Sequence, residues 1–471
     1  MDIHIDLKAG RGLRDEIYRQ LRAAILEERL RPGEALPPTR ELAQRLSVSR
    51  NTVSAAYDRL GAEGFLTTKT GAGTFVRRGS ARPSPPSPSG MALNPVPVWD
   101  EVPELPRRFA VHPAYDFRAG APDVTHFPFD TWRRLVTEQL RGSRAEVLTY
   151  GDPRGHAGLR EAIARQIGLS RDIRARPEDV LVTNGSQQAI DLAARVLLQP
   201  GDRVAVEDPG YPPPRHLFTT LGARPVPVPV DEEGLRVDAI PDDCRLVYVS
   251  PSHQFPLGTA MSLARRLELI AWADRRDAAI VEDDYDSEFR YTGRPLEPLH
   301  SLDTTGRVLY VGSFSKVLLP ALRLGFLVAP PNLHKALGKA RSLTDWHAPT
   351  VEQAALARFM EEGGFTRHVR KMRREYQARH ETVSRIVRRD FADHLTLVPS
   401  TAGLHLTARS RVPSRPIVQA ARRTGVWLYS LGDFTAKRDA LAGLVFGFGA
   451  IPLGKIEPGL ARLRDVFDVQ G

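Results

Sequence analysis

Apolar residues near the N-terminus recur every four positions. Leu13, Ile17, Leu21 and Ile25 follow this spacing, and side chains three or four residues apart share one face of a helix. The Arg-Pro-Gly run at 31–33 ends the pattern, because proline and glycine do not continue a helix comfortably. The spacing therefore predicts a first amphipathic helix before residue 31.

Two shorter helices are expected directly afterwards. Thr39 is expected to cap the first of them and Ser49 the second, after a tight Ser-Val-Ser turn at 47–49. Their apolar faces are Leu42, Ala43 and Leu46 in the first, and Val53, Ala56, Tyr57 and Leu60 in the second. Helix, short turn and helix is the organisation of a helix-turn-helix module.

A hairpin follows the last of these helices. Two β-prone runs at 65–69 and 74–77 flank the Thr-Gly-Ala-Gly stretch at 70–73, and a basic hairpin in this place is a wing. The helix before it offers polar side chains at its N-terminal end, where phosphates and base edges are within reach. Arg50 suits a guanine and Asn51 an adenine or a phosphate. An ordinary helical bundle with surface arginines is the alternative for this pattern alone.

Beyond residue 110, short apolar runs alternate with amphipathic helical stretches. The runs lie at 180–182, 204–206, 246–249, 279–281 and 308–311. Continuous apolar strands separated by helices indicate a mostly parallel sheet covered on both faces. In such sheets ligands bind beyond the carboxyl ends of the strands, so the polar residues directly after each run are the candidates for a site.

The two patterned regions are separated by a stretch of a different kind. From Ser80 to about Val98 the chain is rich in proline, serine and alanine, a composition that favours an extended, semi-rigid linker. A proline-rich ligand for a signalling domain is the alternative. We therefore predict a DNA-binding domain over residues 1–79, a linker over 80–112 and a larger domain over 113–471.

Composition narrows the class of protein. A length of 471 residues requires at least two domains. The net charge is +10, of which residues 1–80 carry +4, with 14 Lys and Arg against 10 Asp and Glu; charge alone therefore does not locate a nucleic-acid site. The single cysteine, Cys244, excludes an intramolecular disulfide and a cysteine-cluster metal site. No apolar run approaches 18 residues. We expect a cytoplasmic protein without a metal site.

Three of the apolar runs in the larger domain end in groups with chemical potential. Lys316 follows the run at 308–311 and could form a Schiff base with an aldehyde cofactor. Asp283 follows the run at 279–281, where a buried carboxylate needs a cationic partner. The Gly-Ser-Gln stretch at 185–187 opens a helix and offers amides to a phosphate. Taken singly, a surface lysine, a loop aspartate and a simple helix cap are the alternatives.

The N-terminal pattern resembles a known DNA-binding family. The string LPPTRELAQRLSVSRNTVSAAYDRL, followed by GFLTTKTGAGTFV, is similar to the winged-helix domain of the GntR superfamily over about residues 8–78. The resemblance implies contacts to DNA from one arginine, from the first turn of the recognition helix and from the wing. These residues are Arg40, Ser49, Arg50, Asn51, Thr52, Thr70 and Gly71.

The larger domain resembles a second family. The strings YGDPRGHAGLREAIA, TNGSQQAIDLAARVL, VEDPGYP, PSHQFPLG, VEDDYDSEFRY and GSFSKVLLPALRLGF fit the fold-type I, aspartate-aminotransferase-like domain over about residues 114–466. With both domains on one chain, the protein resembles the MocR subfamily of GntR-type regulators. The resemblance implies an α+β winged helix-turn-helix joined to an α/β domain that binds pyridoxal 5′-phosphate (PLP).

The same resemblance assigns roles in the cofactor site. Lys316 is implied to form the internal aldimine, Asp283 to pair with the pyridine nitrogen, and Tyr285 to hydrogen-bond the phenolic oxygen. The implied phosphate ligands are Ser186, Gln187, Ser313, Ser315 and Arg323. Tyr211 is implied to pack near the ring, and Tyr150 to reach the phosphate of another subunit, which implies a homodimer.

Two positions depart from the aminotransferase pattern. Phe255 stands where an asparagine usually lies beside the cofactor, and His253 or Gln254 is the candidate to supply the missing hydrogen bond. Val445 stands where an arginine usually grips the substrate carboxylate, and valine cannot replace a bidentate clamp. Arg215 and Arg290 are possible substitutes, although each also fits a surface role.

The sequence thus favours a ligand-responsive transcriptional regulator that binds double-stranded operator DNA as a homodimer and senses PLP or a PLP-bound amine. Genes of vitamin B6 metabolism, or of amino compounds such as GABA or taurine, are the implied targets. The alternative is an active PLP-dependent aminotransferase with an accessory DNA-binding domain. A constitutive DNA-binding protein with a structural cofactor is the third possibility.

Overall fold

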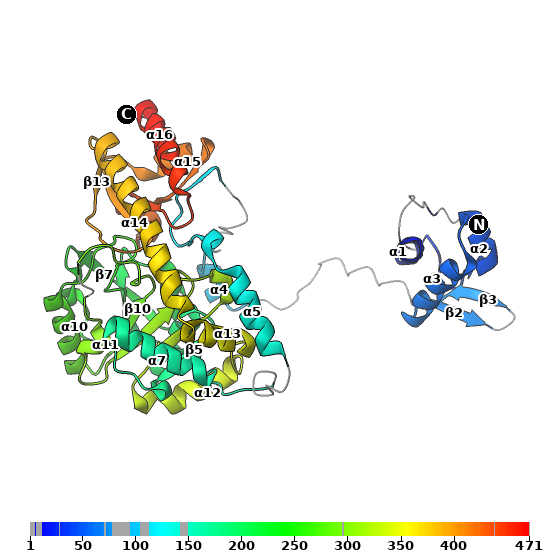
Figure 1. Ribbon diagram of the computed structural model, residues 1–471, viewed down its shortest axis with the longest axis horizontal. Coiled ribbons are helices and arrows are strands. Elements are labelled where there is room, and N and C mark those ends of the chain that lie inside the picture. The colour runs from blue at the N-terminus through cyan, green and yellow to red at the C-terminus, as the bar shows by residue number, and fades with distance from the viewer. Residues whose placement is uncertain are drawn as a thin grey trace. The chain divides into compact units, whose positions relative to one another are not determined.

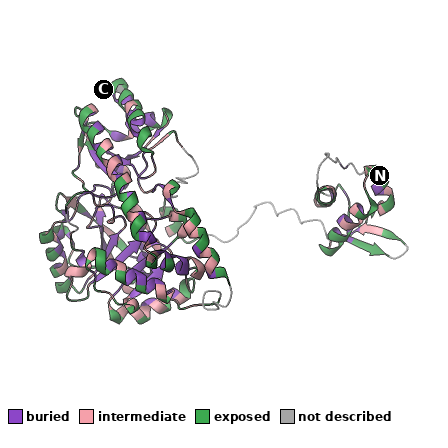
Figure 2. Ribbon diagram, viewed as in Figure 1, coloured by how far each residue is buried: buried purple, intermediate pink, exposed green. Residues whose placement is uncertain are grey.

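The computed structural model describes residues 5, 12–27, 29–69, 72–77, 95–103, 113–141, 149–293, 296–437 and 439–470. The chain divides into two compact units, Met1–Val96 and Pro97–Gly471 (Figure 1). Buried residues gather inside each unit (Figure 2). Each unit is therefore described by itself. No helix in the described ranges is long and apolar enough to cross a membrane.

The small unit contains the predicted helix-turn-helix and wing. Its helices are α1 (Leu13–Leu26), α2 (Thr39–Leu46) and α3 (Arg50–Ala62), and its strands are β1 (Ala35–Leu36), β2 (Leu66–Lys69) and β3 (Gly73–Val76). The strands form an antiparallel sheet in the order β1-β3-β2. Ile17, Val53 and Leu60 are fully buried in the core of the unit. Two residues are too few to give a periodic signal, so the sequence did not predict β1.

The two predicted helix caps have different outcomes. Ser49 caps α3 as expected, because its Oγ accepts a hydrogen bond from the Thr52 amide at 3.1 Å. The prediction for Thr39 is wrong. Pro38 is the N-cap residue of α2 and its carbonyl accepts from the Glu41 and Leu42 amides, so Thr39 is already the first helical residue.

An eight-stranded sheet forms the centre of the large unit. Its order is β5-β12-β11-β10-β9-β6-β7-β8, with β12 and β8 antiparallel to their neighbours and the other pairs parallel. The strands are β5 (Val180–Thr183), β6 (Arg203–Asp208), β7 (Arg224–Asp231), β8 (Gly234–Leu235), β9 (Cys244–Val249), β10 (Ala279–Asp284), β11 (Val308–Ser313) and β12 (Gly325–Val328). The mostly parallel sheet predicted from the apolar runs is confirmed.

Helices cover both faces of this sheet. Ile280 packs with Leu269 of α10 on one face, whereas Val281, the next residue of the same strand, packs with Leu192 of α8 on the other. The helices of this part of the unit, not all of which contact the sheet directly, are α4 (Val98–Glu101), α5 (Phe129–Leu140), α7 (Ala157–Arg171), α8 (Ser186–Leu197), α9 (Pro212–Thr220), α10 (Leu263–Arg275), α11 (Leu299–Leu302), α12 (His334–Thr344) and α13 (Thr350–Glu361). Burial of adjacent residues on opposite faces explains why the strands are continuously apolar.

Strand β7 was not predicted from the sequence because it contains three prolines, at 225, 227 and 229. Proline cannot donate to a strand ladder and is confined to edge positions. In β7 the prolines alternate with residues that remain able to donate to β6, and on the other side β8 pairs only with Val230 and Asp231. The prolines therefore mark a strand near the edge of the sheet.

A long helix, α14 (Gly364–Asp390), leads to a second layered region. There a four-stranded sheet has the order β13-β14-β17-β16, and β15 pairs with β4. These elements are β4 (Tyr115–Asp116), β13 (Leu395–Leu397), β14 (His405–Ser410), β15 (Val426–Trp427), β16 (Tyr429–Ser430), β17 (Gly443–Gly447), α15 (Ser414–Arg423) and α16 (Leu453–Gln470). Short 3-10 turns complete the unit at Val124–His126, Pro177–Asp179, Val237–Ala239, Pro320–Leu322, Pro331–Leu333 and Leu431–Phe434.

Candidate functional site

Lys316 lies just beyond the carboxyl end of β11, among residues from distant parts of the chain. Its Nζ donates a hydrogen bond to the Gly120 carbonyl at 2.6 Å. Burial lowers the pKa of the ammonium group, and the carboxylates of Asp286 and Asp283 oppose that shift. A lysine amine with a lowered pKa is more readily neutral, and the neutral form is the one that attacks a carbonyl carbon.

Asp283 is buried at the end of β10, 4% exposed. Its Oδ2 accepts a hydrogen bond from the Tyr248 hydroxyl at 2.6 Å, whereas its Oδ1 is buried with no partner in the described part of the chain. Burial raises the pKa of Asp283 to about 6, against the effect of the Tyr248 hydrogen bond. A buried carboxylate oxygen without a partner is costly, and the N–H of a protonated pyridine ring is a cation that would satisfy it.

A third group of predicted residues surrounds the first turn of α8. Gly185 is the N-cap residue with φ of +76°, and a Cβ there would lie 2.8 Å from Nη2 of Arg323. That nitrogen donates to the Asn184 carbonyl at 3.0 Å. Gly325 packs against Gly185 and pairs with Ser313 across β11 and β12, which brings the β11 end to the same place. Free helix amides and a guanidinium together suit a phosphate.

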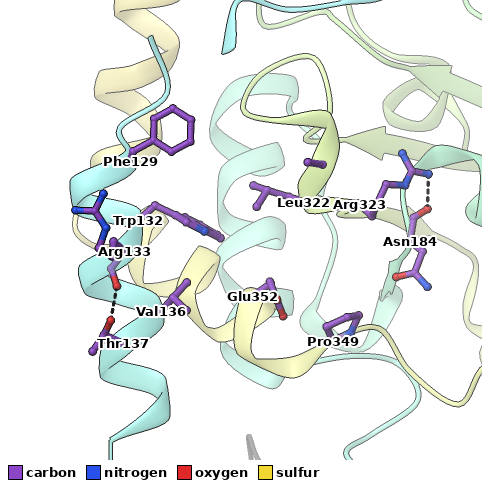
Figure 3. A pocket seen from close by; sticks show the side chains of 11 residues that line it. Phe129, Trp132, Arg133, Val136, Thr137, Asn184, Leu322, Arg323, Pro349 and Glu352 are labelled. Atoms are coloured by element: carbon purple, nitrogen blue, oxygen red, sulfur yellow. Dashed lines mark hydrogen bonds between the residues drawn. The ribbon is translucent and has the colours of Figure 1, made fainter. Parts of the chain in front are cut away.

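An open cavity of about 800 Å³ adjoins this helix end. Arg323 and Asn184 line one side of it and Trp132 of α5 another, with Pro349 and Glu352 between them (Figure 3). The hydrogen bond from Arg323 to Asn184 lies at its border. The phosphate-type cradle is therefore accessible from outside the chain.

Tyr285 and His253 belong to one hydrogen-bonded group. The Tyr285 hydroxyl donates to the His253 carbonyl at 2.8 Å, and Nδ1 of His253 lies 3.0 Å from Oδ2 of Asp286. On its other side, Nε2 of His253 lies 3.2 Å from Oγ of Ser400. His253 and Asp286 are both buried, so this pair holds the loop after β9 against the strand end that carries Asp283.

The two positions that depart from the aminotransferase pattern lie in apolar surroundings. The Phe255 ring centroid is 4.9 Å from that of Phe434 and 5.7 Å from that of Tyr211. Val445 is fully buried in β17 and belongs to the same cluster as Phe434, together with Ala119, the residue before Gly120. Phe255 and Val445 are therefore part of one aromatic and aliphatic cluster.

The two arginines considered as substitutes for the clamp have different surroundings. Arg215 lines a small hollow with Glu207, Tyr211 and Tyr248. Arg290 forms an isolated bridge with Ala402, and burial lowers its pKa.

The remaining predicted cofactor residues are partly exposed. Ser186, Gln187 and Ser315 are half-buried, and Tyr211 is 40% exposed. Tyr150 is 85% exposed, and its described ring contacts are with Trp346 and His347, at centroid distances of 5.6 and 6.2 Å. Tyr150 is therefore not brought together with Lys316 by the described contacts of its own chain.

The predicted DNA-contacting residues form an exposed surface at the start of α3. Ser49, Arg50 and Asn51 are exposed, Thr52 is half-buried, and Arg40 is exposed on α2. Nε of Arg50 lies 3.4 Å from the Thr39 hydroxyl, which joins the two helices at this end. Thr70 and Gly71 lie outside the described residues.

Three site residues were not singled out from the sequence. Tyr248 holds Asp283, Asp286 holds His253, and Glu207 accepts from the amide and hydroxyl of Ser250 at 3.2 and 2.7 Å. Burial raises the pKa of Glu207 to about 7. A polar group inside an otherwise apolar strand was the available signal for Tyr248 and Glu207, but only the neighbouring strands show what it faces.

Family models match both parts of the chain. Residues 13–76 match the bacterial regulatory proteins of the gntR family, and residues 115–414 match aminotransferase class I and II. The first match covers the helix-turn-helix and wing, and the second covers the large sheet with Lys316 and Asp283.

Curated relatives extend over nearly the whole chain. The probable rhizopine catabolism regulatory protein MocR of Rhizobium meliloti is 38% identical, over 98% of this chain and 95% of its own length. The pyridoxine biosynthesis transcriptional regulator PdxR of Corynebacterium glutamicum is 32% identical, over 96% of this chain and 95% of its own. Both similarities include the two units together.

Solved structures are similar to the large unit. Kynurenine aminotransferase of Pyrococcus horikoshii is 28% identical with a TM-score of 0.70, over 75% of this chain and 90% of its own. The α-aminoadipate aminotransferase LysN of Thermus thermophilus is 29% identical with a TM-score of 0.69, over 75% and 91%. LysN was solved with N-(5′-phosphopyridoxyl)-L-leucine, and this fold is that of PLP-dependent enzymes.

Proposed function

Because this chain belongs to the MocR subfamily of GntR-type transcriptional regulators, we propose that it is a PLP-dependent, ligand-responsive regulator. Its winged helix binds operator DNA, and its aminotransferase-like domain holds PLP. A change in cofactor or ligand state then favours one arrangement of the DNA-binding units over another. The cytoplasm is the compartment in which such a protein meets its DNA.

The observation that carries this proposal is the unpartnered, buried Oδ1 of Asp283 beside Lys316. PLP supplies an aldehyde for an amine, a pyridine nitrogen for a carboxylate and a phosphate for a helix N-terminus. Lys316, Asp283 and the first turn of α8 with Arg323 match these three needs. Tyr248 holds Asp283 from one side, which leaves the other oxygen for the ring.

The effector is proposed from the two positions that depart from the aminotransferase pattern and from the relatives. Val445 and Phe255 belong to one apolar cluster, and an apolar cluster at these positions disfavours the carboxylate of an ordinary amino acid. PLP itself, or an amine that reaches PLP, remains as the signal. Relatives are named as regulators of pyridoxine biosynthesis and of rhizopine catabolism, so vitamin B6 or amino-compound metabolism, GABA or taurine use included, is the proposed target.

A homodimer is part of this proposal. Operators read by helix-turn-helix proteins are commonly two-fold symmetric. Tyr150 is 85% exposed and is available to complete the phosphate site of a second subunit. The mass of the wild type in solution would show the dimer. The PLP affinities of the wild type and of Tyr150→Ala would show whether the phosphate site is shared between subunits.

Two measurements on the full-length protein test the proposal. Binding to DNA from upstream of its own gene should be specific and should weaken steeply as salt rises. Reduction with borohydride in the presence of PLP should fix the cofactor on Lys316, as read by peptide mass. Failure to bind any promoter-proximal fragment at moderate salt would refute the regulator, and labelling elsewhere would refute the cofactor site.

An active aminotransferase is the second candidate, because the chain retains Lys316, Asp283 and Arg323. The buried Val445 and the Phe255 ring count against it. Sustained turnover of an amino donor and a keto acid, lost in Lys316→Ala, would establish that activity. We expect turnover to be weak or undetectable.

A further inference from the structure

Helix α14 carries an unusual excess of positive charge. Its 27 residues include nine Lys and Arg against three Asp and Glu, a formal charge of +6. The whole chain has +10, and residues 1–80, which include the winged helix, have +4. One helix of the large unit therefore carries more net charge than the DNA-binding unit.

Most of these cations are exposed and unpaired. The exposed ones that take part in no ion pair or side-chain hydrogen bond within the described ranges are Arg367, Arg370, Lys371, Arg373, Arg374, Arg385 and Arg388. Arg389 is also exposed but pairs with Asp390. Elsewhere on the surface, arginines such as Arg134 and Arg358 are paired with glutamates. The missing counter-charges on α14 leave its cations available to another molecule.

The unpaired cations follow one side of the helix. Arg367, Arg370, Lys371 and Arg374 are spaced three and four residues apart, and Arg385 and Arg388 continue the same side three turns later. The opposite side is buried, as at Met372, Tyr376 and Val383, and Figure 2 shows exposed residues along the outward side of the helix in Figure 1. We call this row, from Arg367 to Arg388, the basic stripe.

The basic stripe has the length of a DNA contact. At about 1.5 Å per residue, the distance from Arg367 to Arg388 is roughly 32 Å, and one turn of B-DNA is about 34 Å. Duplex DNA carries about one negative charge per 1.7 Å of its axis. The stripe consists of two groups of unpaired cations, Arg367 to Arg374 and Arg385 to Arg388, with Glu381 on the same side between them. Together the two groups span one turn of a phosphate backbone and are opposite to it in sign.

We propose that the basic stripe is a second DNA-contacting surface, carried by the large unit and distinct from the winged helix. It binds the phosphate backbone of duplex DNA without reading its sequence, because a row of arginines on one helix face offers charge and few shaped contacts. The proposal rests on the proposed function, since the operator is the DNA that would be bound. An acidic protein is the other negatively charged partner that would suit the stripe, and the test distinguishes it from DNA.

The test uses the full-length protein and two triple variants matched in charge. R370Q/K371Q/R374Q neutralises the stripe, and R165Q/R224Q/K335Q removes three exposed cations from α7, β7 and α12. Affinity is measured across a salt series, on a long upstream fragment and on one trimmed to the footprint of the winged helix. An R370K/R374K variant keeps the charge and serves as the rescue.

For the long fragment, the stripe variant should bind about ten-fold or more weakly at 0.1 M salt. Its log–log salt slope should fall by up to about 2.7, at about 0.9 per lost phosphate contact. The control and the lysine variants should match the wild type, and the trimmed fragment should not discriminate.

An unchanged slope and affinity on the long fragment overturns the proposal while leaving the proposed function intact. So does unchanged DNA binding together with altered transcription in the cell, which would assign the stripe to an acidic protein. A changed mass of the variant in solution would instead assign the stripe to an interface between copies of the chain. If the wild type itself binds neither fragment, it is the proposed function that fails.

Discussion

The two units place their candidate functional residues in opposite environments. In the winged helix, Ser49, Arg50 and Asn51 are neighbours in sequence and exposed to solvent. In the large unit, Asp283 is buried and Lys316 half-buried, and they come from separate strand ends. The first kind of site binds through charge and shape at a surface, whereas the second alters the chemistry of its groups by removing water. The pKa of Asp283 is raised for this reason.

This contrast predicts that the two sites fail separately, and the largest failure is expected at Lys316. Lys316→Ala removes the amine that we propose to attach PLP, so attachment of PLP should be lost completely. DNA affinity without PLP should be essentially unchanged. Absorbance of the PLP-loaded protein and operator binding are the measurements. Residual labelling of the variant at another lysine would break the assignment.

A change at the exposed site should do the reverse. Arg50→Ala removes a side chain suited to a bidentate base contact, which is worth about 1–3 kcal/mol. Operator affinity should therefore fall roughly 5- to 150-fold, while PLP binding is unchanged. Arg29→Ala, an exposed arginine of the same unit, is the matched control. Equal losses in both variants would mean that Arg50 contributes only general charge.

The buried site should also make stability depend on pH. The folded-state pKa of Asp283 is about 6, above the value of about 3.9 for an unfolded aspartate. The folded state therefore binds this proton more tightly, and stability falls as pH rises from about 4 to 6 and stays lower above that. In Asp283→Asn this contribution, up to about 3 kcal/mol, should disappear from the cofactor-free protein.

Chemical denaturation of cofactor-free wild type and Asp283→Asn at about pH 4.5 and about pH 7.5, on either side of the folded-state value, measures the effect. From the lower to the higher pH, the wild type should lose more stability than the variant. The variant should also bind PLP more weakly. An identical pH difference in both proteins would show that Asp283 is not the group that titrates. In the cofactor-free protein, Tyr248→Phe should shift the pH dependence of stability without removing it.

The smallest effect is expected at the helix N-termini of the winged helix. Ser49→Ala removes the hydrogen bond to the Thr52 amide, and loss of such a cap costs about 1 kcal/mol. Thr39→Ala should cost less, because Thr39 does not cap α2. Thermal unfolding of the small unit within the full chain gives both values. A larger loss at Thr39 would contradict the observed cap.

The same contrast explains what the sequence could predict. The helices and the hairpin of the small unit follow from local spacing, and the continuous apolar runs predicted the strands of the large sheet. Strand β7 was missed because its prolines argue against a strand until its place near the edge is known. The hydrogen bond from Tyr248 to Asp283 joins neighbouring strands 35 residues apart, and no spacing along the chain encodes it. Contacts such as those of His253 with Asp286 and Ser400 depend on three separate loops.

We propose that the cofactor state of the large unit controls DNA binding by the small one. The most direct test is the affinity of the full-length protein for its upstream DNA, with and without PLP at fixed salt, in the wild type and in Lys316→Ala. We expect that PLP, alone or with an effector amine, changes the affinity or the footprint of the wild type and leaves the variant unaffected. Equal affinities and footprints for the wild type in every cofactor and amine condition would contradict it.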